Sequence, residues 1–237
     1  MIEAFITNLG KYNEGQLCGE YLKFPATTED VQEVLSNIGV DGVLYEGFFI
    51  SEYRIDEPVS CLLDCLGERE SIDELNYLTA LLEEMDKDGL EKFGAMVEYG
   101  NYTGSVKDLI NLAQNLDSYH YFHGVKTEKD LGTHMIEELC MLEVPDNLAG
   151  YFNYEAYGHD IFLGNSGTFA TCGYIEESYG SFPEHYAGLE DLPEEHKIFA
   201  YPDPPEKMSI KEQLAVYANM VTGATAKDTH KLAYGDR

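Results

Sequence analysis

The chain has 237 residues, 44% of them apolar, a composition typical of a protein with a buried core rather than of a disordered chain. Its 44 acidic residues against 15 Lys and Arg give a formal net charge of −29, which argues against direct binding to nucleic acid or to anionic lipid. No apolar run approaches the roughly 18 residues of a membrane span. Five cysteines without a CxxC pair favour a reduced, cytoplasmic protein.

Residues 1–60 predict a small N-terminal α+β domain. Two β-rich stretches, Glu3–Leu9 and Leu17–Phe24, flank a turn at Gly10–Gln16. A helix with capping residues and an apolar stripe then follows Pro25 and ends at Gly39. The segment Gly42–Ile55 predicts one or two further strands.

Residues 61–103 predict a helical middle domain. Ser71 and Glu74 have the spacing of a capping box, and apolar residues recur at helical spacing from Ile72 to Met85. The segment Asp88–Tyr99 continues the helical pattern.

Residues 104–165 predict a third, α+β domain, and residues 166–237 a C-terminal extension. In chain order we expect a helix, a strand, a capped helix and another helical stretch, at Ser105–Leu116, Asp117–Val125, Thr127–Leu142 and Pro145–Phe162. The extension predicts a hairpin, an extended Pro-rich surface segment and an amphipathic helix, at Gly167–Ser178, 182–208 and Ser209–Val221. The predicted fold class is α+β, an elongated multi-domain chain of small α/β and helical modules.

The sequence gives only weak signals for a metal site or a catalytic site. His120 and His123, with His134 nearby, would point to opposite faces of a strand, so they cannot easily share an ion. Cys61 and Cys65 provide two ligands only, and the calcium-like start at Asp86 lacks the later ligands. The motif YFNYEAYGHDIF (Tyr151–Phe162) resembles an active site in composition, but it would need a cleft with convergent polar groups. We therefore predict no catalytic residues, no metal and no cofactor.

The negative charge is spread along the whole chain. The net charge is −8 over residues 1–60, −8 over 61–100, −7 over 101–165 and −6 over 166–237, whereas an acidic tail would concentrate it in one block. Solubility, adaptation to high salt and a strongly basic partner are the three explanations. Duplex DNA carries one charge per ~1.7 Å, so 29 charges correspond to roughly 50 Å of duplex, which makes a groove built for nucleic acid one candidate partner.

Acidic residues three and four positions apart on a helix lie about 5–6 Å apart at Cβ, so a helix face can carry dense negative charge. Between residues 70 and 100, Lys87 and Lys92 are the only basic residues. This depletion favours a negative surface selected for binding over an ordinary solvated face. The candidate partner-binding acids are Glu29, Glu33, Glu68, Glu70, Asp73, Glu74, Glu83, Glu84, Asp86, Asp88, Glu91, Glu98, Asp108, Glu128, Asp130, Glu137 and Glu138.

Two segments resemble the ArdA antirestriction family. NLGKYNEGQLCGEYLKFP (Asn8–Pro25) is similar to its N-terminal signature, and LEVPDNLAGYFNYEAYGHDIF (Leu142–Phe162) to its C-terminal one, with Asn153 where an Asp is more usual. The resemblance covers about residues 1–165. It implies an elongated, three-domain, dimeric DNA mimic encoded on mobile genetic elements. Such proteins occupy the DNA-binding groove of type I restriction–modification enzymes and block both cleavage and methylation.

The resemblance also implies a location for the dimer contact. Leu131–Val144 corresponds to an antirestriction motif described near the dimer interface of the family. The residues expected at this contact are Met135, Leu139, Leu142, Tyr151 and Tyr154. The resulting hypothesis is a stoichiometric inhibitor without turnover. The alternative is an acidic adaptor or chaperone for basic DNA-binding proteins such as nucleoid factors.

Overall fold

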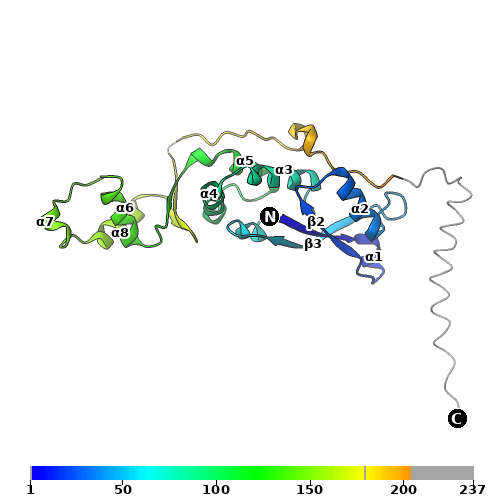
Figure 1. Cartoon of the computed structure of the whole chain (residues 1–237), viewed down its shortest axis with the longest axis horizontal. Helices are drawn as coiled ribbons and strands as arrows, with labels where there is room; N and C mark the ends of the chain where they lie inside the picture. Colours follow the sequence, from blue (N-terminus) through cyan, green and yellow to red (C-terminus); the bar gives the residue numbers. More distant parts are fainter. Residues whose placement is uncertain (1, 179, 204–237) are drawn as a thin grey trace, which may run out of the picture. The chain divides into compact units, whose positions relative to one another are not determined.

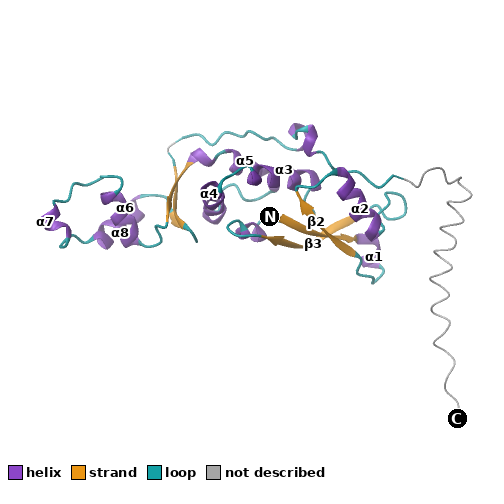
Figure 2. Cartoon of the chain, in the orientation of Figure 1, coloured by secondary structure: helices purple, strands orange, loops and turns teal. Residues whose placement is uncertain are grey.

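The computed structural model describes residues 2–178 and 180–203, which have an α+β fold of helices and two three-stranded antiparallel sheets (Figures 1 and 2). The α+β class expected from the sequence is confirmed. The amphipathic helix expected at Ser209–Val221 lies outside the described residues. Within the described part, no helix is both long and apolar enough to cross a membrane.

The first sheet has the strand order β2-β1-β3, with β1 antiparallel to both neighbours. Its strands are β1 (Ile2–Asn8), β2 (Gly19–Phe24) and β3 (Phe48–Ile55). Helix α2 (Thr28–Ile38) begins with a capping box between Thr27 and Asp30 and buries one apolar face. These elements confirm the three strands and the helix expected near the N-terminus.

The expected turn after the first strand is instead a short helix, α1 (Leu9–Asn13). The helix begins there because the side-chain oxygen of Asn8 accepts a hydrogen bond from the backbone N–H of Lys11, at 2.9 Å. Asn8 is itself buried and donates to the carbonyl groups of Ile38 and Gly39. The end of α2 therefore fixes the start of α1.

The third strand starts later than its sequence suggests, at Phe48 rather than at Gly42. The Asp41 carboxylate accepts hydrogen bonds from the backbone N–H groups of residues 43–45, at 2.8–3.1 Å. An Asp that bonds its own following backbone stabilises a turn, which competes with strand pairing.

The middle of the chain forms a helical layer, which lies along one side of the first sheet in Figure 1. Each of its helices starts at a polar residue whose side chain accepts from the first turn: Ser71, Asp86 and Ser105. The expected helices are thereby confirmed. They are α3 (Ile72–Glu83), α4 (Lys87–Tyr99) and α5 (Val106–Gln114), preceded by a 3-10 turn at Ser60–Asp64.

The second sheet has the strand order β4-β6-β5. A 3-10 turn (Leu116–Ser118) leads into β4, and the strands are β4 (Tyr119–His123), β5 (Thr168–Phe169) and β6 (Gly173–Glu177). Strands β5 and β6 form the hairpin that was expected at Gly167–Ser178, so that prediction is confirmed. Because β6 pairs with β4 along its whole length, the first residues after 165 complete the sheet of the preceding segment.

Between β4 and β5 lie α6 (Glu128–Glu137), α7 (Asp146–Ala149) and α8 (Tyr154–Gly164). The single helical stretch expected through Phe162 is thus divided. Helix α7 ends at Ala149, and α8 has its own start, because the side chain of Asn153 accepts from the N–H of Ala156.

Helices α6 and α8 pack backbone against backbone at two glycines. A Cβ at Gly132 would overlap the carbonyl oxygen of Tyr154, and one at Gly158 would overlap the carbonyl oxygen of Glu128. The pair encloses a small second core, separate from the main core that spans the first sheet and the helical layer. Its buried residues are Val125, Leu131, Met135 and Tyr174.

After β6 the chain runs back as an extended segment, residues 182–201, which we call the strap. It contains two short 3-10 turns, Leu189–Asp191 and Glu194–His196. In Figure 1 the strap follows the outer side of α5 and α3. The extended segment expected at 182–208 is confirmed as far as residue 203, where the described residues end. Tyr186, Leu192 and Ile198 are buried in the main core, so the strap packs into the fold and does not lie wholly on its surface.

Candidate partner-binding surface

Most of the candidate acids lie on the surface, and in the described part of the chain none of the exposed ones forms an ion pair. Their carboxylates are therefore available to a cationic partner. The exposed candidates are Glu29, Glu33, Glu68, Glu83, Glu84, Asp86, Asp88, Glu98, Asp130, Glu137 and Glu138.

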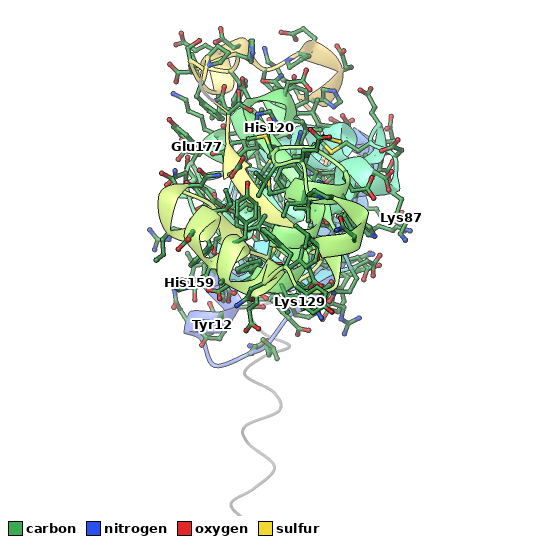
Figure 3. The ribbon with its side chains drawn as sticks, turned by 90° about the vertical axis from the view of Figure 1, so that its left-hand side faces the viewer. Tyr12, Lys87, His120, Lys129, His159 and Glu177 are labelled. Atoms are coloured by element: carbon green, nitrogen blue, oxygen red, sulfur yellow. The ribbon has the colours of Figure 1, made fainter. Side chains whose placement is uncertain are left out.

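The junction between α3 and α4 carries the densest group of these acids. Glu83 and Glu84 end α3, and Asp86 caps α4 by accepting from Gly89 N–H at 2.8 Å. The nearby Lys87 projects outward at the edge of the view in Figure 3. Its ammonium group lies 3.4 Å from Glu91 and so does not pair with the exposed acids of the junction.

Several candidate acids hold the fold together as well as carrying charge. The hydroxyl group of Thr127 caps α6 by accepting from the backbone N–H of Asp130, and it donates in turn to the Asp130 carboxylate. Glu98 accepts from the backbone N–H of Thr171 at 2.7 Å, and Glu70 from that of Gly67 at 2.9 Å. Asp108 accepts from the hydroxyl group of Ser105. These contacts fix the carboxylates in place, which reduces their conformational freedom before a partner binds.

Asp73 and Glu74 are half-buried and bind the strap. One oxygen of Asp73 accepts from the backbone N–H groups of Ile198 and Phe199, at 2.8 and 2.7 Å. Glu74 accepts from the hydroxyl group of Tyr186 at 3.0 Å, so the expected capping box keeps only its Ser71 half. Neither carboxylate is freely available to a partner.

The prediction that Glu91 belongs to the partner-binding surface is wrong, because the residue is buried. It lies among exposed acids in the sequence, yet it is 7% exposed, since its position on α4 faces inward against β4. Its carboxylate contacts His123 Nδ1 at 2.7 Å and Lys87 at 3.4 Å. A buried carboxylate requires such partners. We therefore remove Glu91 from the candidate surface.

The expected dimer contact is partly exposed and partly buried. Met135 is 4% exposed within the second core, so it cannot contact a partner directly. Leu139, Leu142 and Tyr151 are exposed, with Tyr151 89% accessible, while Tyr154 is half-buried. An open hollow of about 650 Å³ lies beside them, lined by Ile136, Cys140, Val144 and Ala149 among others.

Two further exposed apolar side chains, Met141 and Leu148, lie in the segment that links α6 to α8. Sequence reasoning missed them, because helical spacing alone does not distinguish a core-facing apolar residue from an exposed one. Large exposed apolar groups close together are typical of interaction sites.

The motif Tyr151–Phe162 contributes packing and pairing contacts. Tyr157, Ile161 and Phe162 pack against the second core. His159 Nδ1 lies 2.8 Å from the Glu128 carboxylate, and that hydrogen bond raises the pKa of the imidazole above its ordinary value. Burial, followed by the charge of Glu137, raises the pKa of the Tyr154 phenol. These side chains are occupied by structural contacts of α6 and α8.

The histidines of the predicted metal candidate are not brought together as ligands. His120 is exposed on β4, His123 pairs with Glu91, and His134 packs against the ring of Phe122. Within the described residues, no group of three or more His, Cys, Asp or Glu side chains could hold a metal ion.

The strap adds exposed acids that sequence reasoning did not assign to the surface. It lies over α3 and α5, so its carboxylates cover part of the face that these helices would otherwise present. Only its extended Pro-rich composition pointed to a surface position. The exposed acids of the strap are Glu184, Glu190, Asp191, Glu194 and Glu195.

Comparison with known proteins gives one family. The family model described as antirestriction protein (ArdA) matches residues 4–176, from the third residue of β1 to the residue before the end of β6, and does not reach the strap. A search of curated proteins gave no match.

Proposed function

Because the chain belongs to the ArdA family of antirestriction proteins, we propose that it is a DNA mimic, which occupies the DNA-binding groove of type I restriction–modification enzymes. Occupation of the groove would inhibit both restriction and modification. The observation that carries this proposal is the set of exposed acids, from α2 in the first part of the fold to α6 near the second core, that form no ion pair with any residue the structure describes. They would meet the Lys and Arg side chains that otherwise bind phosphates.

The affinity comes from many weak contacts. Each exposed carboxylate contributes a small electrostatic energy, and counterions released from the enzyme's groove add a favourable entropy. The protein acts stoichiometrically, without turnover and without a cofactor, in the cytoplasm where these enzymes meet DNA. Replacement of one exposed acid, for example Glu83, should then leave inhibition nearly unchanged while the fold persists.

We further propose a homodimer formed through the exposed apolar residues beside α6 and α8. Leu142 is 41% exposed there, so a charged side chain should disrupt the contact without disturbing the core. Sedimentation equilibrium should show a dimer for the wild type and a monomer for Leu142→Asp. Leu17→Asp, at a residue 75% exposed next to β2, is the matched control and should remain dimeric. A dimeric Leu142→Asp protein would refute this contact.

The alternative function, an acidic adaptor or chaperone for basic DNA-binding proteins, shares the charge but requires no match to the shape of DNA. Fluorescence anisotropy separates the two. A labelled DNA duplex is bound to a purified type I methyltransferase or to a basic nucleoid protein, and the acidic protein is added to each. DNA mimicry predicts displacement from the methyltransferase at far lower concentration than from the nucleoid protein. Equal displacement would favour the adaptor.

A further inference from the structure

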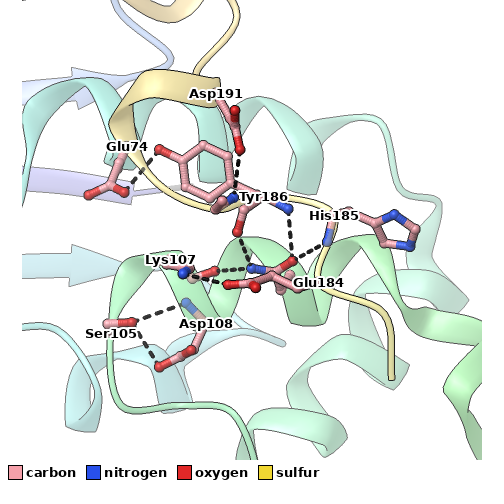
Figure 4. A network of polar contacts seen from close by, with 10 residues as sticks. Glu74, Ser105, Lys107, Asp108, Glu184, His185, Tyr186 and Asp191 are labelled. Carbon is pink, nitrogen blue, oxygen red and sulfur yellow. Dashed lines mark hydrogen bonds and ion pairs between the residues drawn. The ribbon is translucent and has the colours of Figure 1, made fainter. Parts of the chain in front are cut away.

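The strap is held by side chains that recognise its backbone. Asn111 on α5 uses both ends of its amide group: Oδ1 accepts from the N–H groups of His185 and Tyr186, and Nδ2 donates to the carbonyl of Tyr186 at 2.7 Å. Figure 4 labels His185 and Tyr186 of the strap, together with the Glu74 carboxylate that accepts from the hydroxyl group of Tyr186. Asn115, one turn later, donates to the carbonyl of Pro183 at 2.9 Å. Both asparagines are at most 5% exposed, so without the strap their polar groups would lose buried partners.

The other end of the strap is held in the same way. Asp73 accepts from two consecutive N–H groups, at Ile198 and Phe199. Beyond them, the carbonyl of Tyr201 accepts from Gln32 on α2, and the hydroxyl of Tyr201 donates to the carbonyl of Glu46. The strap thus spans from α5 to the first sheet, where Phe199 packs against Phe48.

In the described part of the chain, the hydrogen bonds from the strap backbone to the rest of the protein all run to side chains, and none belongs to a β ladder. A strand in a sheet opens only when the ladder breaks, whereas a segment held by a few side chains can open locally. The buried side chains of Tyr186, Leu192 and Ile198 supply the remaining attachment.

We propose that the strap is a lid over the α3–α5 face, with Asn111 as its latch, and that it can open without unfolding of either sheet. In the closed lid, the strap forms hydrogen bonds with the carboxylates of Asp73 and Glu74. The exposed acids of the strap then lie on the surface of this face. Opening frees both carboxylates and exposes the side chains of the main core that now bury Tyr186. The lid lies outside the family match at residues 4–176 and does not depend on the proposed DNA mimicry.

Asn111→Asp tests the latch in the full-length protein. The substitution keeps the shape of the side chain, but an ionised carboxylate cannot donate to the carbonyl of Tyr186 and repels it. Hydrogen exchange at the N–H of Tyr186 and tryptic cleavage after Lys197 both report opening of the strap. We expect both rates to rise about tenfold or more, since loss of a buried hydrogen bond with an unsatisfied acceptor has that effect. Exchange in β1 should not change.

Asn13→Asp, at an exposed residue of α1, makes the same chemical change away from the strap and should behave as the wild type. A second variant, Asp73→Ala, releases the other end and should speed exchange at Ile198 and Phe199. Its matched control is Glu83→Ala, on the same helix, since the Glu83 carboxylate forms no hydrogen bond or ion pair with the strap as the structure describes it. The second variant decides the question if Asn111→Asp fails to fold.

Two results would overturn the proposal. In the first, neither Asn111→Asp nor Asp73→Ala changes exchange in the strap or cleavage after Lys197. In the second, every folded variant that loosens the strap also loosens β1 to the same extent, because the strap would then open only with the whole fold.

Discussion

At the residue scale, the pair of His159 and Glu128 gives a pH-dependent contribution to stability. Glu128 raises the pKa of His159 above its ordinary value of 6.5, so the folded state binds the proton more tightly than the unfolded state. The contribution is therefore complete below about pH 6.5 and is lost as the pH rises through the pKa of the folded state. Glu128→Gln should destabilise the protein more at pH 5.5 than at pH 9, measured by urea unfolding.

The imidazole can be followed directly by NMR. The pKa of His159 should fall towards 6.5 in Glu128→Gln. Glu155→Gln, an exposed residue on the same helix as His159, changes the net charge equally and should have little effect. A pKa of His159 that stays the same in Glu128→Gln would show that the pair does not exist in solution.

The burial of individual carboxylates could not be predicted from the local sequence. Glu91 has the same acidic neighbours as Glu83 and Asp88, but it is buried because α4 packs against the second sheet, where His123 meets it. That pairing joins residues 32 positions apart and has no local signal. Asp73 and Glu74 differ likewise from their neighbours, since a segment more than 110 positions later reaches them.

At the element scale, the crossing of α6 and α8 depends on Gly132 and Gly158. A methyl group at either position overlaps a carbonyl oxygen of the facing helix, and backbone atoms cannot move aside as a flexible side chain can. Gly132→Ala and Gly158→Ala should each lower the free energy of unfolding of this region by about 1–3 kcal/mol or more. Circular dichroism with urea is a suitable measurement.

Gly164→Ala is the matched control on α8. No atom outside the local chain lies within 4 Å of its Cβ position, so the change should be neutral or stabilise by up to about 1 kcal/mol. Equal effects at positions 158 and 164 would contradict the proposed helix contact.

The sequence predicted elements whose signals are local. The helices with polar caps at Thr27, Ser71 and Ser105 and the first three strands were all expected, because capping and alternation act over a few residues. The helix after Asn8 was missed, since this cap is stabilised by contacts with Ile38 and Gly39. The docking of the strap was missed for the same reason: its partners are distant in sequence.

At the scale of the whole molecule, a net charge of −29 should oppose the compact state. Salt shortens the Debye length to about 10 Å at 0.1 M and so weakens this repulsion. The melting temperature of the free protein should therefore rise between 0.02 and 0.5 M NaCl, over which the Debye length falls from about 21 to about 4 Å. The same rise in KCl would indicate screening rather than binding of one ion. A constant or falling melting temperature would show that repulsion does not limit stability.

Salt should weaken the complex between the protein and its target enzyme, although it stabilises the free protein. This loss of affinity is the central expectation of DNA mimicry. For DNA bound to a protein, the logarithm of the association constant falls linearly with the logarithm of the salt concentration. The slope is set by the number of ion contacts. The most direct measurement is this slope for the protein bound to a type I methyltransferase, alongside a DNA duplex bound to the same enzyme. The account predicts that both affinities fall steeply and in parallel as salt increases. An affinity of the protein that does not change while that of DNA falls would contradict it.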